Sequence, residues 1–524
     1  MANKTLFKSV FGKLLPKSDM VNEAGGQAYR FDATHALAQF AATGCLNSTF
    51  YASGDGQLTK VLELCEKLEP EFIARTALFA RQKGFMKDMP ALLCAALSVK
   101  GPGLMAEIFD RVIDNPKMLR NFVQIMRSGV VGRKSLGTLP KRLVLQWLES
   151  RSDEQIFFGS VGQDPSLADI VKMVHPKPAT ASRAALYGYL LGRECNAETL
   201  PEVVRTYEAF KQNPTEAGAV PDVPFQMLTS LELSREQWAG IARNASWQMT
   251  RMNLNAFLRH GVFELPDMAK LIADRLRSPE LIAKARVFPY QLMVAYLSGS
   301  QRLPAEVHEA LQDAMEIALA NVPAVDGKVH VFPDVSGSMQ SPVTGFRKGS
   351  TTAVRCIDVA ALVAAAVLRK NPRTEVIPFE CGVVRVRLNP RDSVMTNAQK
   401  LASVGGGGTN CSAPLQYLNK RRATGDLVIY VSDNESWVDS PRHGGFTVSS
   451  TETMRQWAEF KRRNPQARMV CIDIQPYDST QAKEHKDIIN VGGFSDQVFN
   501  LIADVAGGQA DAGHWVKQIE AMVL

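Results

Sequence analysis

The fold of the C-terminal part is decided by Lys328-Val329-His330-Val331-Phe332-Pro333-Asp334-Val335-Ser336-Gly337-Ser338. The first half of this stretch is mostly apolar and predicts a buried strand, which ends in an acid followed by alternating serines. Two further apolar runs, residues 427–431 and 469–474, are separated from it and from each other by helical patterns. Strands that alternate with helices indicate a mainly parallel sheet covered on both faces, which is a doubly wound α/β domain.

The change of pattern at Pro323 places this α/β domain at residues 323–524. Its other expected elements are two strands at 374–379 and 383–388, and helices at 352–370, 412–421, 451–463, 494–503 and 514–523. Ligands of such sheets bind at the carboxyl ends of the strands. The loops that follow the strands are therefore the first place to look for a site.

Three of these loops carry oxygen ligands. Asp334, Ser336 and Ser338 follow the first strand, Thr409 follows a run of four glycines, and Asp433 follows strand 427–431. Two carboxylates and three hydroxyls favour Mg²⁺ or Mn²⁺ and disfavour Zn²⁺. The sequence predicts a magnesium site here, and a vestigial or purely structural metal is the alternative.

The preceding region, residues 21–322, follows a helical period almost throughout. Helical segments at 58–67, 71–82, 91–99, 104–113, 141–149 and 179–191 are separated by Gly and Pro breakers. Many short helices joined by short turns favour a degenerate HEAT-like repeat domain; a compact irregular helical domain is the alternative. Residues 1–20 form a basic tail with Lys4, Lys8, Lys13 and Lys17.

Basic residues concentrate between residues 111 and 142, where eight Lys and Arg side chains stand against one acid, Asp114. Such a surface attracts phosphates; a solvated helical face is the alternative. The candidate residues for contact with a nucleic-acid backbone are Arg127, Arg133, Lys134, Lys141, Arg142, Lys172, His175, Lys177, Arg183, Arg251 and Arg259.

The remaining features narrow the class of protein. The chain has 60 Lys+Arg, 53 Asp+Glu and a net charge of +7, and its eight cysteines form no C-x-x-C pair. We expect reduced core thiols in a cytoplasmic protein. Residues 1–20 lack the apolar core of a signal peptide, and the longest apolar run, residues 359–368, is too short to span a bilayer. Ser336 lacks a G-x-S-x-G elbow and the histidines form no H-x-x-x-H, so we expect no catalysis.

The D-x-S-x-S stretch, the later Thr409 and Asp433 together resemble the metal-ion-dependent adhesion site of von Willebrand factor A domains. Phrases in the helical region, at residues 37–51, 132–147, 174–178, 252–259 and 284–289, resemble the TROVE domain of the Ro autoantigen family, including its bacterial members. That family has the same order of domains, and the resemblance covers nearly the whole chain from about residue 20.

The resemblance implies a ring of helical repeats with a basic central hole. It implies that small noncoding Y RNAs bind the outer surface and that single-stranded 3′ ends of misfolded or aberrant RNA enter the hole. It further implies cooperation with an exoribonuclease such as polynucleotide phosphorylase in RNA quality control, by a protein that does no chemistry. A ring made by one chain needs no oligomer, so we expect a monomer. In the adhesion site, one coordination position of the metal would stay open for an acidic ligand.

One stretch departs from the family. Family members carry basic residues upstream of the phrase that contains His175, and these residues touch Y RNA. Here residues 155–170 contain no Lys or Arg but do contain Asp164 and Asp169. This departure leaves three alternatives for the bound RNA. It is smaller, it binds elsewhere on the protein, or it is contacted through Lys172, Lys177 and Arg183 instead.

Two other functions compete with RNA binding. The first is a protein-binding adhesion module, in which the A domain uses Mg²⁺ to hold an acidic side chain of a partner and the helices serve as a scaffold. The second is a metal-dependent nuclease or a chelatase subunit. A site rich in Ser and Thr lacks the clustered carboxylates of two-metal catalysis, which disfavours the enzyme.

Overall fold

The computed structural model describes residues 15–43, 46–214, 220–285, 287, 289–299, 301–319, 322, 324–325, 327–346, 354–440, 449–493, 496–510 and 513–524. Its described residues divide into two compact units. The first, the sheet unit, draws on Met1–Leu68, Ile282–Ser298 and Leu311–Ala521. The second, the helical unit, draws on Glu69–Leu281, Gly299–Ala310 and Met522–Leu524. The boundary predicted at residue 323 does not coincide with this division, because residues up to Leu68 belong to the sheet unit.

The sheet unit is built on five parallel strands in the order β4-β3-β5-β6-β8. They are β3 (Val329–Pro333), β4 (Glu375–Val376), β5 (Leu427–Ser432), β6 (Arg468–Asp473) and β8 (Ile488–Gly492). Val329 pairs with Leu427, and Leu427 with Arg468, so the strands that end in the predicted site lie side by side. Every residue of β3 and β5 is buried, as continuous apolar runs require when both faces are covered.

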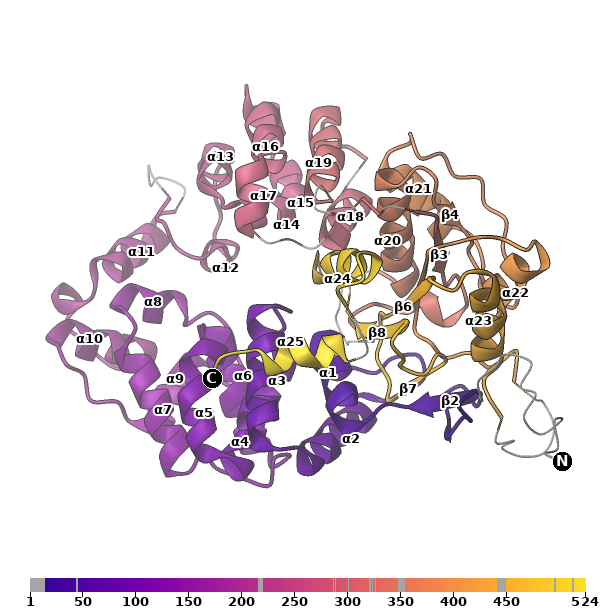
Figure 1. The fold of residues 1–524 in the computed structure, drawn as a ribbon. Helices are drawn as coiled ribbons and strands as arrows, with labels where there is room; N and C mark the ends of the chain where they lie inside the picture. The colour runs from indigo at the N-terminus through magenta and orange to yellow at the C-terminus, as the bar shows by residue number, and fades with distance from the viewer. Residues whose placement is uncertain are drawn as a thin grey trace, which may run out of the picture. The chain divides into compact units, whose positions relative to one another are not determined.

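Helices cover both faces of this sheet (Figure 1). They are α20 (Cys356–Lys370), α21 (Val394–Ala402), α22 (Ala413–Lys420), α23 (Glu452–Arg463), α24 (Asp496–Ala506) and α25 (His514–Glu520). Helices α20, α21 and α24 lie on one face, and α22 and α23 on the other. Helix α20 is apolar all round and buried from Cys356 to Leu368. The predicted doubly wound fold is confirmed.

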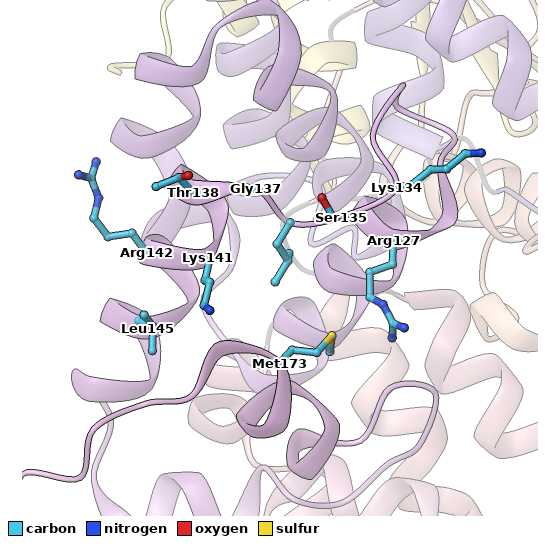
Figure 2. Close-up of a pocket in the computed structure, with 10 residues that line it drawn as sticks. Arg127, Lys134, Ser135, Gly137, Thr138, Lys141, Arg142, Leu145 and Met173 are labelled. Atoms are coloured by element: carbon cyan, nitrogen blue, oxygen red, sulfur yellow. The ribbon is translucent and has the colours of Figure 1, made fainter.

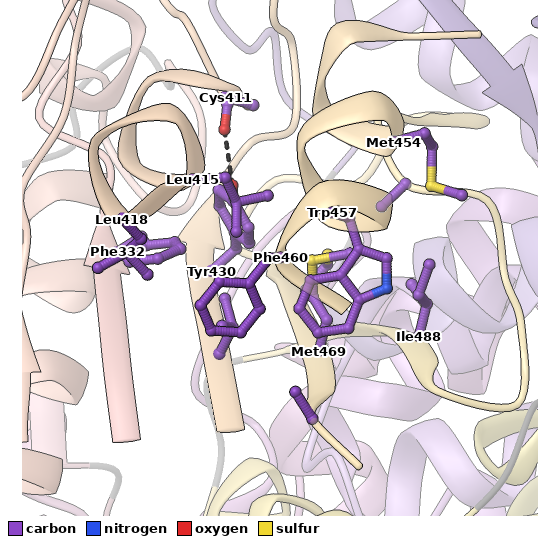
Figure 3. Packing of buried hydrophobic residues seen from close by; sticks show 14 of the residues in the cluster. Phe332, Cys411, Leu415, Leu418, Tyr430, Met454, Trp457, Phe460, Met469 and Ile488 are labelled. Carbon is purple, nitrogen blue, oxygen red and sulfur yellow. Dashed lines mark hydrogen bonds between the residues drawn. The ribbon is translucent and has the colours of Figure 1, made fainter. Parts of the chain in front are cut away.

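Large side chains fill the layer between the sheet and helices α22 and α23 (Figure 3). Phe332 and Tyr430 come from β3 and β5, and Trp457 and Phe460 from α23. The Tyr430 hydroxyl is buried but donates a hydrogen bond of 2.7 Å to the carbonyl of Cys411. A buried phenol needs such a partner, so this bond keeps the layer free of an unsatisfied polar group.

The first described residues also belong to this unit. Strands β1 (Met20–Val21), β2 (Gln27–Arg30) and β7 (Ser479–Thr480) form a small antiparallel sheet. Helix α1 (Ala33–Thr43) packs against β8 and α25, and is followed by α2 (Gly54–Lys67). Residues 21–68, which the sequence pattern assigns to the helical repeats, therefore pack on the α/β domain.

The helical unit is a succession of short helices, most of which pack against helices close to them along the chain. They are α3 (Pro70–Gln82), α4 (Asp88–Lys100), α5 (Pro102–Val112), α6 (Pro116–Ser128), α7 (Thr138–Glu149), α8 (Asp153–Phe158), α9 (Leu167–Val174), α10 (Ala181–Leu190), α11 (Glu202–Gln212), α12 (Phe225–Leu228), α13 (Arg235–Asn244), α14 (Trp247–Met252), α15 (Leu254–Arg259) and α16 (Met268–Leu276). Helices α17 (Pro279–Ala285) and α19 (Ala305–Ala318) each draw residues from both units, and α18 (Pro289–Ser298) belongs to the sheet unit. The predicted helical region is confirmed. Among the described residues no helix is both long and apolar enough to cross a bilayer.

Two expectations for the α/β domain need correction. The predicted strand at 383–388 is wrong: only Val383 forms a bridge, with Phe379, and the chain after Val384 runs unpaired. The predicted helix at 352–370 begins at Cys356, where Arg355 and Asp358 form the cap, and residues 351–353 lie outside the described residues. Helix α21 and strand β8 were not predicted, since each has a short, mixed sequence that only packing selects.

Candidate functional site

The predicted metal-binding side chains converge at one edge of the sheet. Asp334 follows β3 and Asp433 follows β5, which is its neighbour. The chain leaves β3 for β4 on one side and reaches β5 on the other, so a crevice opens between the ends of β3 and β5. Ser336, Ser338 and Thr409 complete the group, and all five residues are buried. The sequence thus identified a set of residues that the fold brings together.

Hydrogen bonds fix the first carboxylate in place. Asp334 accepts one from the backbone N–H of Ser336 at 2.8 Å and another from the hydroxyl of Ser432 at 2.6 Å. The hydroxyl oxygens of Ser336 and Ser338 lie 3.2 Å apart. Ser432 was not among the predicted site residues, although it directly precedes Asp433; its role depends on the pairing of β3 with β5, which the sequence alone does not show.

The electrostatics of this site favour a cation. Burial and the neighbouring Asp433 raise the pKa of Asp334 to about 7, and burial also raises the pKa of Asp433. Among the described residues neither carboxylate has an ion pair with Lys or Arg. Two close, buried carboxylates repel each other when both are ionised, and a divalent ion would relieve this. The residues present therefore fit Mg²⁺ or Mn²⁺.

The glycine run shapes the loop that carries Thr409. Gly405 and Gly406 have φ of +89° and +116°, and Gly406 donates to the carbonyl of Val335 at 2.8 Å. A Cβ on Gly405 would lie 2.1 Å from that carbonyl oxygen. Only glycine allows this close approach, so the run is needed to bring Thr409 next to the first strand.

Two further residues at this site were not predicted. The carboxylate of Glu380 accepts a hydrogen bond of 2.7 Å from the N–H of Gly407 and so holds the glycine loop. The phenol of Tyr51 is hydrogen bonded to Ser338 and Thr409, and its pKa is raised by burial and by Asp433. Tyr51 lies in the segment that the sequence pattern assigns to the helical repeats, so no local signal could have connected it with the metal ligands.

The described part of the chain has no metal site built from acids, histidines and cysteines alone. Its His, Cys, Asp and Glu side chains nowhere form a group of three that could hold a metal. The candidate metal site therefore depends on hydroxyl and water oxygens for most of its ligands, as hard cations accept and zinc does not favour.

A second site lies in the helical unit, where a pocket of about 630 Å³ opens between α7, α9 and the connection from α6 to α7 (Figure 2). Four predicted RNA-binding residues line it: Arg127, Lys134, Lys141 and Arg142. Figure 2 shows Arg127 and Lys141 extending toward Met173, and Lys134 and Arg142 reaching outward on opposite sides. None of the four has an ion pair among the described residues, so their charges are available to a ligand. We call this the basic pocket.

The other predicted RNA-binding residues fall into two groups. Lys172, His175, Lys177 and Arg259 are exposed, and His175 ends α9 with φ of +52°. Arg133, Arg183 and Arg251 make contacts within the helical unit. Arg133 donates to the carbonyl of Ser98 at 2.9 Å, Arg251 is 9% exposed, and Arg183 pairs with Asp153 and donates to the carbonyl of Leu148 at 3.1 Å.

Residues 155–170, which contain no Lys or Arg, include an acid that the structure places at the start of α9. Asp169 caps α9 together with Ser166, whose hydroxyl donates to it at 2.7 Å. This hydrogen bond lowers the pKa of Asp169, so the carboxylate stays ionised. Its negative charge lies close to Lys172 and Arg127. The acid weakens the positive field on this side of the basic pocket.

Three comparisons with known proteins agree with the geometry. Residues 328–506 match the family model of the Ro60 von Willebrand factor A domain. The chain is 24% identical over 528 aligned residues to the RNA-binding protein RO60 of Deinococcus radiodurans, covering 94% of this chain and 96% of that protein. The crystal structure of the D. radiodurans RO (RSR) protein has the same fold, with a TM-score of 0.62 at 20% identity, covering 91% of this chain and 100% of the other. The family resemblance of the sequence is confirmed as a similarity: the chain is similar to an RO60 protein over almost its whole length, and its residues 328–506 match the Ro60 von Willebrand factor A domain.

Proposed function

We propose that this protein is a non-catalytic RNA-binding protein and that the basic pocket is part of its RNA interface. The observation that carries the proposal is a group of four cationic side chains without ion pairs around an opening of about 630 Å³. Phosphates bind such a surface by releasing counterions, with little dependence on base sequence. The D. radiodurans relative is named an RNA-binding protein, which supports the assignment.

The lining of the basic pocket suggests which form of RNA it takes. Leu136, Leu145 and Met173 add apolar side chains to this lining. Unpaired bases bury their faces against apolar or aromatic groups, while a duplex presents only its backbone. We propose that an unpaired nucleotide enters here, as at the single-stranded 3′ end of a misfolded RNA.

A second RNA surface is proposed around the end of α9. His175 and Lys177 are exposed in the turn after this helix, and Lys172 is exposed on its last turn. These residues are proposed to contact the backbone of a small, Y-like noncoding RNA. With such an RNA bound there, the basic pocket would stay available to the 3′ end of a misfolded RNA. The protein would then act together with an exoribonuclease in the cytoplasm.

The A domain is proposed to hold Mg²⁺. Asp334 and Asp433 would supply carboxylate oxygens, directly or through water, and Ser336, Ser338 and Thr409 would supply hydroxyl oxygens. The bound ion would act as a Lewis acid toward an incoming oxygen ligand. The chain's own contribution is to hold these oxygens in place, through the bond from Ser432 to Asp334 and the bond from Gly407 to Glu380.

An adhesion module remains the second candidate because all five positions of the metal site are present and buried. In that case binding of a protein partner depends on the metal. Removing the metal with EDTA, or changing Asp334→Ala, then abolishes partner binding and leaves RNA binding intact. Both functions can coexist in one chain, since the basic pocket and the metal site belong to different units.

The test measures binding of a labelled RNA hairpin with a single-stranded 3′ tail. Arg127→Glu/Lys141→Glu should weaken binding strongly, because both side chains point into the basic pocket. The matched control is Arg193→Glu/Arg205→Glu, which changes the charge equally at exposed positions elsewhere in the helical unit. Equal losses in both variants would show a diffuse charge effect and remove the basic pocket from the proposal. Incubating the RNA with the protein and Mg²⁺ should leave its length unchanged; shortening would contradict the non-catalytic assignment.

A further inference from the structure

The open edge of the sheet offers a second, independent binding surface. Strand β4 is the last strand on its side. After β4 the chain turns at Glu380, whose N–H donates to Gly382 at 2.9 Å, and comes back along the edge. Val384 donates to Pro378 at 2.8 Å, and there the pairing stops. The hairpin is therefore paired only next to its turn, and among the described residues its two arms are not hydrogen bonded to each other beyond Val384.

A slot lies between the two arms of this hairpin. It has a volume of about 460 Å³ and is lined by Glu375, Val376, Ile377, Val383, Val384, Arg385, Val386, Arg387 and Tyr417. A strand residue occupies about 160 Å³, from a rise of about 3.3 Å, a strand spacing of about 4.8 Å and a sheet spacing of about 10 Å. The slot therefore matches roughly three residues of an extended chain.

The backbone on both sides of the slot is free to pair. Val376 is the register partner of Val331 in β3, and among the described residues its backbone makes no hydrogen bond to a segment beyond β4. Residues 385–388 make no backbone hydrogen bond within the described part of the chain. Unpaired strand edges of this kind are templates for an added strand.

The side chains at the slot alternate as those of a strand do. Val384 and Val386 are half-buried, whereas Arg385 and Arg387 are exposed. Neither arginine has an ion pair or a hydrogen bond with a described residue. Glu375, the one acid of the lining, is already paired with Arg421 at 2.5 Å. The slot thus combines apolar walls with uncompensated positive charge at its rim.

We propose that this slot binds an acidic segment of a partner protein, which inserts as an extended strand between β4 and residues 383–388. Apolar side chains of the segment face Val384 and Val386, and its carboxylates face Arg385 and Arg387. The three longest of the chain's own segments outside the described residues, 1–14, 347–353 and 441–448, contain Lys or Arg and no acid, so their charge does not complement the rim of the slot. A sugar-phosphate backbone lacks the N–H and C=O groups that a strand edge pairs with, which favours a peptide over RNA.

The probe is a fluorescein-labelled peptide, Glu-Val-Asp-Val-Glu-Val-Asp, titrated with the full-length protein by fluorescence anisotropy. Its control has proline in place of the central valine, which keeps the charge but removes one N–H and blocks strand pairing. We expect the first peptide to bind and the second to bind at least about tenfold more weakly. Hydrogen exchange of the amides of residues 385–388 should slow when the first peptide is bound, since these amides gain partners.

Variants separate the slot from the RNA surface. Arg385→Glu/Arg387→Glu should weaken peptide binding about tenfold and leave binding of the tailed RNA hairpin unchanged. Arg193→Glu/Arg205→Glu should change neither. Equal affinity for the two peptides, or unchanged exchange at residues 385–388, overturns strand insertion. If the peptide does not bind and the Arg385→Glu/Arg387→Glu variant loses RNA binding, the slot is an RNA surface and the proposal is overturned. The assignment of the basic pocket is tested separately, by the Arg127→Glu/Lys141→Glu variant.

Discussion

The dependence of RNA affinity on salt gives a quantitative test of the basic pocket. Each phosphate that a cation neutralises contributes about −0.7 to the slope of log K against log salt for single strands. If all four cations of the basic pocket contact phosphates, the slope is about −2.8. Raising the salt from about 50 to about 200 mM then weakens binding roughly fiftyfold.

Removing Arg127 and Lys141 by substitution with alanine leaves two of these cations. The slope should fall to about −1.4, and the same change in salt should weaken binding only about sevenfold. The assay is fluorescence anisotropy of a labelled single-stranded RNA at several salt concentrations, with the Arg193→Ala/Arg205→Ala variant as the control. A slope that stays near the wild-type value in the Arg127→Ala/Lys141→Ala variant would refute the reasoning, because it would mean that the phosphates lie elsewhere.

Three further predictions concern the metal site and the packing. Asp334 has a pKa of about 7 in the folded protein and about 3.9 when unfolded, so the folded metal-free protein holds more protons between these values. Its Tm should therefore fall as the pH rises from about 5 to about 8, Mg²⁺ should raise the Tm most at the upper end, and Asp334→Asn should reduce both effects in differential scanning fluorimetry, while Asp433, whose pKa is also raised by burial, keeps part of the pH dependence. Gly405→Ala should cost about 1–3 kcal/mol in chemical denaturation because of its positive φ and the carbonyl of Val335, whereas Gly382→Ala, with nothing within 4 Å of the added Cβ, should be nearly neutral. Arg183→Ala should lower the free energy of unfolding by about 2 kcal/mol, because it removes the partner of Asp153 and of the Leu148 carbonyl; a large loss of RNA affinity without loss of stability would instead give Arg183 the RNA-binding role.

The convergence of the candidate metal ligands could be predicted from the sequence because Asp334 and Asp433 follow strands that are apolar throughout. Runs such as residues 427–431 identify buried parallel strands, and the ends of such strands meet at one edge. The adjacency of Asp334 and Asp433 follows from this rule. Ser432, Glu380 and Tyr51 could not be found in the same way, since each reaches the site through a contact that depends on the pairing of distant segments.

The candidate RNA-binding residues were harder to separate from structural ones. Charge density along the chain identified the stretch that contains Lys134 and Lys141, but the same pattern included Arg133, which donates to the carbonyl of Ser98. The sequence pattern does not distinguish an arginine that is hydrogen bonded to backbone carbonyl groups from an arginine whose side chain is available to bind a phosphate. Only the packing of α4 against its neighbours tells them apart.

The strand at 383–388 shows a different limit. Its alternating Val and Arg residues favour a strand, and the residues do alternate between half-buried and exposed. The backbone pairing is nevertheless missing beyond Val384. Periodicity reports which face of a segment is covered, but it does not report whether a neighbouring strand is present.

The pairing of the first described residues with the last part of the sheet has a consequence for how the chain is made. The side chain of Gln39 donates a hydrogen bond of 3.0 Å to Asp473, which lies 434 residues later. At about 5–20 residues per second, roughly 20–90 s separate the synthesis of these two residues on the ribosome. During that time the helical unit, which is mostly one continuous segment from Glu69 to Leu281, has all of those residues available and can fold. Strand β2 meanwhile lacks its partner β7, and helix α1 lacks β8 and α25, so most of the sheet unit forms after most of the helical unit although its first residues are made first.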